Sequence, residues 1–290
     1  MTIAIGRRTL LRQTALVMMT AVLTMGTGSI YAGVAQVRGR WLEVNRVSGQ
    51  VSYQRQGSQP ARVGNRLDAP GQGITTGANS SAGLAVDNNI GTIAVAANSQ
   101  LVVRQISSLA NGAQVTLLDL PRGQARLQVR RFTNPDSRLE LRTPSGLAAV
   151  RGTEFGVSVT DTGQTAIGTL EGVVEASAQG QSVQLGAGLV SVIRPGKAPT
   201  APQLLDRDLA LDLTAHYRRG RVVYLQGQIN PTNRLLLDGT DIVVTPSGRF
   251  STTVVLPSTN RGVTLTVANA LGESRDYRIR GWRLEDVDRG

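Results

Sequence analysis

Between Trp41 and Ile193 the chain consists of short runs in which apolar and polar residues alternate, and Gly, Asn, Asp or Pro interrupts them every eight to twelve residues. Alternation at period two is typical of a strand with one buried face, whereas a helix would repeat its apolar residues every three to four positions. No stretch of comparable length keeps helical spacing with capping residues at both ends. The region therefore predicts an all-β domain, formed as a rolled or solenoid-like stack of short strands.

A second alternating region begins at Arg221, after a segment rich in proline. Three prolines within Arg194–Pro202 resist both a helix and a central strand, so this segment predicts a linker. Beyond it, short strands separated by turn signals such as Asp238-Gly239 predict a small β-sandwich. The predicted organisation is a signal peptide over residues 1–32, the first all-β domain over 42–195, the linker over 196–214 and the sandwich over 215–281.

The first 32 residues have the pattern of a secretory signal peptide. Three arginines precede residue 13, and residues 14–25 supply a short apolar run. The segment Ile30-Tyr31-Ala32 that follows ends in a small residue, Ala32, as a cleavage site requires. The apolar run is short and interrupted for a span of about 20 residues, so we expect no stable membrane span. We expect export to the periplasm or another extracytoplasmic location with cleavage near Ala32; an uncleaved anchor is the alternative.

The charge of the chain favours acidic partners outside the cytoplasm. The formal net charge is +11, and removing the three arginines of the leader lowers it to +8. In an exported protein this positive charge indicates a partner such as an acidic protein face, lipid headgroups or an anionic envelope polymer. We do not expect the protein to bind nucleic acid. Because the charges are spread along the chain, an ordinary solvated surface is the alternative. The absence of cysteine excludes thiol and disulfide chemistry.

The segment Val150–Val159 combines alternation with two glycines. Phe155, Val157 and Val159 fall at period two, so they are expected to share one face of a strand. Gly152, just before them, suits a bulge or the close approach of another backbone, which a side chain would block. The candidate structural motif comprises Gly152, Thr153, Glu154, Phe155, Gly156, Glu171 and Gly172.

Other short motifs surround this segment in a characteristic order, with Thr143-Pro144 before it and Glu171-Gly172-Val173 after it. The succession resembles the FecR domain, named for the ferric-citrate regulator of bacterial envelopes, over residues 42–195. The resemblance implies a non-catalytic extracytoplasmic interaction or signalling protein that docks an envelope protein partner. Residues 215–281 resemble, more loosely, the immunoglobulin-like modules of bacterial envelope proteins.

In the regulators that gave the family its name, a cytoplasmic segment and a membrane span precede the domain. A chain that starts with an export signal leaves no room for a cytoplasmic segment that binds a sigma factor. We therefore expect an adaptor of the cell envelope instead of direct sigma-factor control. The alternative function is a structural envelope module that binds peptidoglycan or surface polysaccharide.

The sequence offers little for catalysis. His216 is the only histidine, so neither a histidine-rich metal site nor a proton relay with a second histidine can be built, and no metal or cofactor is expected. Glu154 and Glu171 could form a carboxylate pair for glycoside cleavage, but only 3% of the residues are aromatic, which leaves few platforms for a sugar. A structural role for Glu154 is favoured, and the chain is not expected to be an enzyme.

Four arginines form the candidate partner-binding face. The segments 125–130 and 138–142 alternate in the same way, and a hairpin between them would place leucine and valine side chains on one face and arginines on the other. The arginines have two alternative explanations. They could be the solvated face of a half-buried hairpin, or they could lie on an edge strand whose charges prevent aggregation. The arginines of this predicted face are Arg126, Arg130, Arg138 and Arg142.

Overall fold

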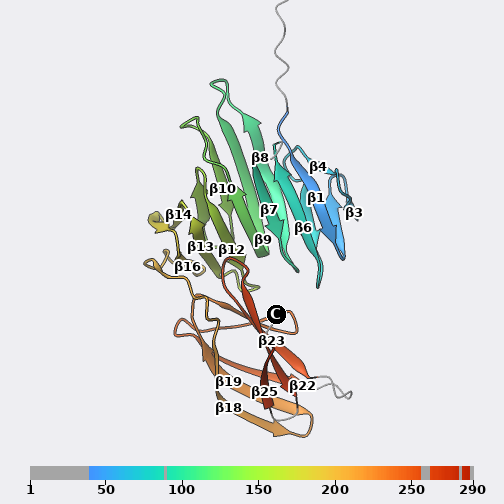
Figure 1. Ribbon diagram of the computed structural model, residues 1–290, viewed down its shortest axis with the longest axis vertical. Coiled ribbons are helices and arrows are strands. Elements are labelled where there is room, and N and C mark those ends of the chain that lie inside the picture. Colours follow the sequence, from blue (N-terminus) through green and yellow to red (C-terminus); the bar gives the residue numbers. More distant parts are fainter. Residues whose placement is uncertain (1–38, 88–89, 256–261, 281–282, 288–290) are drawn as a thin grey trace, which may run out of the picture. The chain divides into compact units, whose positions relative to one another are not determined.

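The computed structural model describes residues 39–287 except for 88–89, 256–261 and 281–282, so the predicted signal peptide and its cleavage site at Ala32 lie outside the described residues. Within these ranges the chain forms strands and no helix (Figure 1), which confirms the all-β prediction. It follows that this part holds no helix of the length and hydrophobicity needed to cross a membrane.

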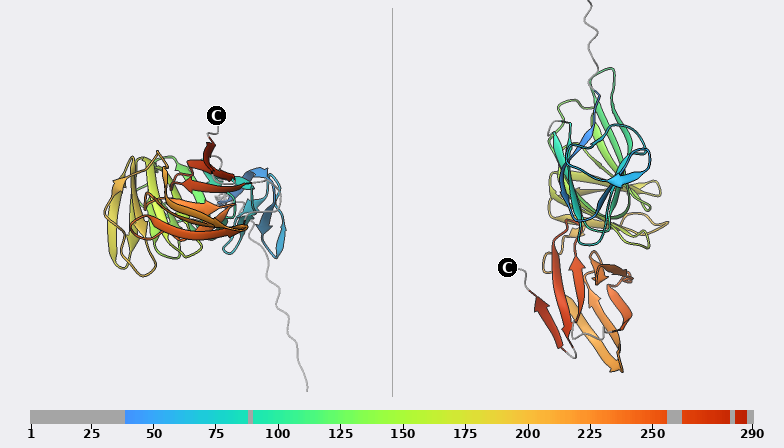
Figure 2. Two further views of the ribbon diagram at one scale, coloured as in Figure 1. Left: turned by 90° about the horizontal axis from the view of Figure 1, so that it is seen from below. Right: turned by 90° about the vertical axis from the view of Figure 1, so that its right-hand side faces the viewer.

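The first domain consists of two sheets, and the chain passes between them repeatedly (Figure 1). Seen from below, the strands advance from the N-terminal end, in blue, toward β16, in yellow (Figure 2, left). Sheet A has the order β4 (Arg66–Leu67), β1 (Leu42–Ser48), β6 (Ser81–Val86), β7 (Gly91–Val95), β9 (Gln114–Val129), β12 (Glu154–Val159), β13 (Thr165–Glu171), β16 (Leu189–Ile193), β17 (Gln203–Leu204). Sheet B has the order β3 (Ser58–Pro60), β2 (Val51–Gln54), β5 (Gly73–Thr76), β8 (Gln100–Ser108), β9, β10 (Arg138–Arg142), β11 (Leu147–Val150), β14 (Val173–Ala178), β15 (Gln181–Gly186).

Strand β9 belongs to both sheets. Its first half pairs with β8 and, in parallel, with β10, while its second half pairs with β7 and β12. Gly123 lies between the halves with φ of 86°, and a Cβ atom there would lie 2.2 Å from the hydroxyl of Ser99. A glycine at this bend lets one continuous strand turn from sheet B into sheet A.

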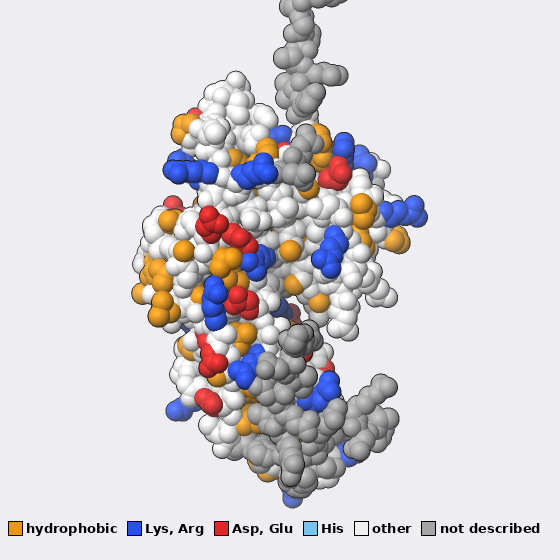
Figure 3. Space-filling model, in the orientation of Figure 1, with side chains coloured by type: hydrophobic (Ala, Val, Ile, Leu, Met, Phe, Trp, Pro, Cys, Tyr) orange, Lys and Arg blue, Asp and Glu red, His pale blue; other side chains and the backbone are white. Residues whose placement is uncertain are grey.

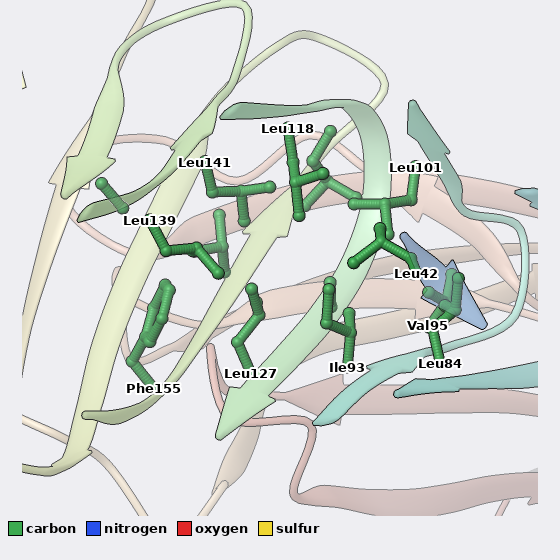
Figure 4. Close-up of a cluster of buried hydrophobic side chains, with 14 of the residues drawn as sticks. Leu42, Leu84, Ile93, Val95, Leu101, Leu118, Leu127, Leu139, Leu141 and Phe155 are labelled. Carbon is green, nitrogen blue, oxygen red and sulfur yellow. The ribbon is translucent and has the colours of Figure 1, made fainter. Parts of the chain in front are cut away.

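The core of the first domain lies between the two sheets. Inward-facing side chains at every second position of both sheets form one buried cluster, part of which Figure 4 shows. Phe155, Val157 and Val159 belong to this cluster and are fully buried, so the face predicted for them is confirmed. Full burial of one such side chain stabilises the fold by about 2 kcal/mol.

The C-terminal region is a sandwich of a three-stranded and a five-stranded sheet. One buried cluster, which includes Leu225 and Phe250 of the smaller sheet and Leu265 of the larger one, joins their inner faces. The structure begins this region before residue 215, and two residues of the predicted linker pair with β16 as strand β17. The smaller sheet has the order β18 (Leu211–Arg219), β19 (Val222–Ile229), β22 (Arg249–Val255), and the larger one β21 (Thr240–Ile242), β20 (Arg234–Leu237), β23 (Val263–Ala268), β24 (Ser274–Arg280), β25 (Arg283–Val287).

The outer face of sheet A is covered along β12, β13 and β16. Leu205 and the β23–β24 turn at Ala270 and Leu271 form a small apolar cluster with outward-facing residues of these strands. Gly156 and Gly168 pair directly beneath the turn, and a Cβ atom at Gly156 would lie 2.1 Å from the carbonyl oxygen of Ala270. Glycine at this position therefore permits the backbone of the turn to rest on the sheet.

Candidate functional site

A groove lies on the part of the outer face of sheet A that this turn leaves open. Cross-strand partners place Arg46 of β1, Gly83 of β6, Ala94 of β7 and Arg126 of β9 in one outward-facing row. Ala94 has a small side chain, and the amide of Asn45 lies over Gly83, so the side chains between the two arginines are shorter than the arginines themselves. The result is a cavity of about 500 Å³, and Leu271 of the turn forms part of its wall.

A second cavity of about 620 Å³ adjoins the first. Thr92 of β7, Gln128 of β9 and Glu154 of β12 line both cavities, and these three residues are cross-strand neighbours in a second outward-facing row. Glu171 continues this row on β13, and Arg130 and Arg131 line the second cavity beyond the end of β9. We call the two cavities together the outer groove.

An ion pair lies where the two cavities meet. Arg126 donates from Nε and Nη2 to Oε1 of Glu154, at 2.9 and 2.6 Å. The two side chains are 39% and 18% exposed, so water screens the pair and its net contribution to stability is within about 1 kcal/mol. Its main consequence is geometric, because the bonds hold the guanidinium group in the groove.

The glycines of the candidate motif lie where backbones and side chains meet closely. Gly152 has φ of 140°, and a Cβ atom there would lie 2.3 Å from the Cα atom of Arg131. At Gly172, with φ of 82°, a Cβ atom would lie 2.6 Å from Cγ2 of Thr153. Gly152 thus has the close backbone approach that the sequence predicts, and this approach shapes the second cavity.

The hairpin predicted for the four arginines is wrong. Residues 138–142 form β10, which pairs in parallel with residues 115–119 of β9, not with 125–130. Arg126 and Arg130 line the outer groove, whereas Arg138 and Arg142 lie on β10 in sheet B, where Arg138 pairs with Glu140 at 2.8 Å. The predicted alternation is correct, since Leu127, Val129, Leu139 and Leu141 are all buried.

Glu154 and Glu171 are brought together as cross-strand partners of β12 and β13. The carboxylate of Glu154, however, is held by Arg126, so it is placed as an ion-pair partner and not as a free acid or base. In the described part of the chain, no group of three His, Cys, Asp or Glu side chains could hold a metal ion. The groove therefore offers arginine, amide, hydroxyl and carboxylate groups.

Sequence reasoning placed Gln128 on the same face as Arg126 and Arg130, but it missed Arg46, Thr92 and Arg131, which also line the groove. Their outward direction could be read from alternation within each strand, but their proximity depends on which strands pair. Ser81 and Gly83 of β6 and Ala94 of β7 are small residues at outward-facing positions, and this group of small residues was a usable signal for a depression in the sheet face.

The arrangement defines an all-β domain of two sheets with a groove on one outer face. In a comparison of sequences, residues 72–175 match the family described as FecR protein, and every residue that lines the second cavity lies within this range. None of the curated proteins matches the chain.

Among solved structures, the chain is similar to two crystal structures of a proposed anti-sigma factor from Parabacteroides distasonis ATCC 8503, determined at 2.50 and 1.65 Å resolution. The identities are 15% and 14%, and the TM-scores are 0.33 and 0.37. The alignments cover 39% and 46% of this chain and 51% and 59% of those chains, so they span less than half of this chain and a little more than half of each of those chains.

Proposed function

We propose that this protein is a non-catalytic interaction or signalling component of the bacterial cell envelope, and that its FecR-like domain docks a protein partner. The observation that carries the proposal is the FecR match over residues 72–175, which includes the strands β6, β7, β9 and β12 around most of the outer groove. The groove supports docking, because it is an open, arginine-bearing depression on the outer face of sheet A.

The side chains of the groove support a binding role more than a catalytic one. The residues that line it include no histidine, cysteine or lysine; of its two glutamates, Glu154 is ion-paired with Arg126 and Glu171 is exposed to solvent. Nucleophilic catalysis needs a nucleophile within hydrogen-bond reach of a base, and general acid catalysis needs a carboxyl group free to give up its proton.

The proposal includes export, cleavage near Ala32 and a periplasmic or other extracytoplasmic location. It also includes an immunoglobulin-like assignment for the C-terminal sandwich, which the two facing sheets and their joint core support. N-terminal sequencing of the protein from fractionated cells tests the first part. A mature chain that starts at Gly33 is expected, and a full-length chain in the cytoplasm would refute export.

The docking role is tested by recovering the tagged, exported protein from intact envelopes at low and high salt. A packed protein interface should retain the same partner at both salt concentrations. Binding to an anionic polymer through arginines should weaken steeply, because screening acts over about 8 Å at physiological ionic strength. The surplus of arginine makes this second function, an envelope module that binds peptidoglycan or surface polysaccharide, the competing outcome.

A further inference from the structure

We infer that the cavity between Arg46 and Arg126 binds an extended acidic segment of a protein partner, with one carboxylate on each arginine. This inference rests on the proposed docking role and names the chemistry of the docked segment. Arg46 is exposed, lies at one end of the row, and is separated from Arg126 along the row by Gly83 and Ala94. The amide of Asn45 lies over Gly83, so the two arginines flank a floor formed by Ala94 and this amide.

The spacing of the two arginines fits an extended chain. They lie three strand spacings apart in sheet A, which is about 14 Å between their backbones. In an extended segment, residues four positions apart project to the same side and lie about 13 Å apart. Two acidic residues at positions i and i+4 of a segment that crosses the strands could therefore reach both arginines at once.

Arg126 keeps the capacity to bind a carboxylate although it is paired with Glu154. The guanidinium group has five N–H donors, and the two bonds to Glu154 use one from Nε and one from Nη2. Arginine suits a carboxylate because its planar fork can donate two parallel hydrogen bonds. Fixation by Glu154 reduces the side-chain entropy that such a contact would otherwise cost.

The floor and wall of the cavity distinguish a peptide from a charged polymer. Ala94 is exposed and offers a small apolar side chain between the arginines, where residue i+2 of the bound segment would point. An apolar side chain at that position would fill the depression. A uniformly charged polysaccharide has no such group and would be attracted to the spread surface charge, which Figure 3 shows as basic and acidic side chains interspersed over one face of the molecule.

The first test measures the binding of fluorescein-labelled peptides to the whole exported protein by fluorescence anisotropy at physiological salt. The probe carries two glutamates four residues apart with a leucine midway. We expect it to bind about tenfold more tightly than peptides in which both glutamates are glutamine, or in which they are two residues apart. Equal affinity for the three peptides would overturn the inference.

Variants locate the peptide. Arg46→Gln removes one charge, and Ala94→Leu fills the floor from an outward-facing position; each should lower the affinity by about tenfold, with an unchanged melting temperature. Arg142→Gln, an exposed arginine of sheet B, is the matched control and should change the affinity less than about twofold. If polygalacturonate displaces the peptide from the parent and binds Ala94→Leu as tightly, the site takes a polymer and the inference is wrong.

Recovery from envelopes separates this inference from the proposed function. If the parent recovers a protein partner and Arg46→Gln and Ala94→Leu recover it equally well, the groove is not the docking site, although the docking role stands. If the parent recovers no protein partner, the docking role fails whatever the peptides show. If both groove variants lose a partner that Arg142→Gln retains, the result supports both the docking role and the binding of an acidic segment in the groove.

Discussion

The outer face of sheet A is divided into a covered part and an open part, although both are built from the same alternating strands. In the covered part, β12, β13 and β16 present Gly156, Gly168, Ala166 and similar small or apolar residues to the β23–β24 turn. In the open part, β7 and β9 present Thr92, Gln128 and other polar residues to solvent. The outward-facing side chains of each part therefore match their surroundings, which are the packed turn in the covered part and solvent in the open part.

Gln124 marks the border between the two parts. Its amide Nε2 donates to the carbonyl oxygens of Asn269 and Ala270, at 2.8 and 3.2 Å, while Arg126, two residues further along β9, faces the groove. Two successive outward-facing residues of β9 therefore lie in different parts of the face: Gln124 contacts the turn, and Arg126 lies in the open part. Small outward-facing residues occur in both parts, at Gly156 under the turn and at Ala94 in the groove, so the comparison teaches that burial on the second face depends on which distant segment packs over it.

The largest difference between the two parts should appear when a valine is introduced into each. Gly156→Val in the covered part would force the turn at Ala270 from the sheet, and overpacking of this kind costs about 3 kcal/mol. Thr92→Val in the open part should change stability by less than about 0.5 kcal/mol. Urea unfolding measures both, and similar losses for the two variants would contradict the division of the face.

Gly152 should show a smaller effect, because it lies beside the second cavity and no second layer covers it. Gly152→Val places a branched residue at φ of 140° against the backbone of Arg131, and we expect a loss of about 2 kcal/mol. Thr153→Ser, the neighbouring control, should be mild. Equal and negligible shifts in the two urea melts would mean that the motif does not constrain the fold.

The ion pair of the open part should contribute less than either glycine. Glu154→Gln keeps the shape of the side chain and removes its charge, so the loss of stability should be about 0.5 kcal/mol. Raising the salt concentration should reduce the difference between the variant and the parent, because the pair is partly exposed. Thermal melts at two salt concentrations check this, and a difference that persists at high salt would indicate a buried role.

Substitution of the arginines of the predicted binding face should have the smallest effect on stability. Its effect on partner recovery should differ between the arginines of the groove and those of sheet B. Arg130→Ser and Arg138→Ser are exposed substitutions that should each change stability by less than about 0.5 kcal/mol. Recovery of the partner should fall for Arg130→Ser, which borders the outer groove, and remain for Arg138→Ser on sheet B. An equal fall in both would restore the four-arginine face as the contact and weaken the case for the groove.

The inward face of each strand could be predicted from the sequence because it depends on a local period, and Phe155 and Leu127 are buried accordingly. The pairing of strands could not, because alternation says which way a side chain points and nothing about its neighbour. Gly123 illustrates the limit: a glycine followed by a new alternating run indicates a break, yet here it bends an unbroken strand. The cover over Gly156 comes from residues 269–273, more than a hundred positions away, and no local pattern reports it.

The passage of β9 from one sheet to the other also bears on how the domain assembles. When only the strands before β9 have been made, β7 and β8 each end a sheet with an unsatisfied edge, and unpaired edges invite pairing with other chains. A single segment, Gln114–Val129, closes both edges at once and provides the template for β10 and β12. We therefore expect the two sheets to form together in one cooperative step, which cannot occur before β9 has been synthesised.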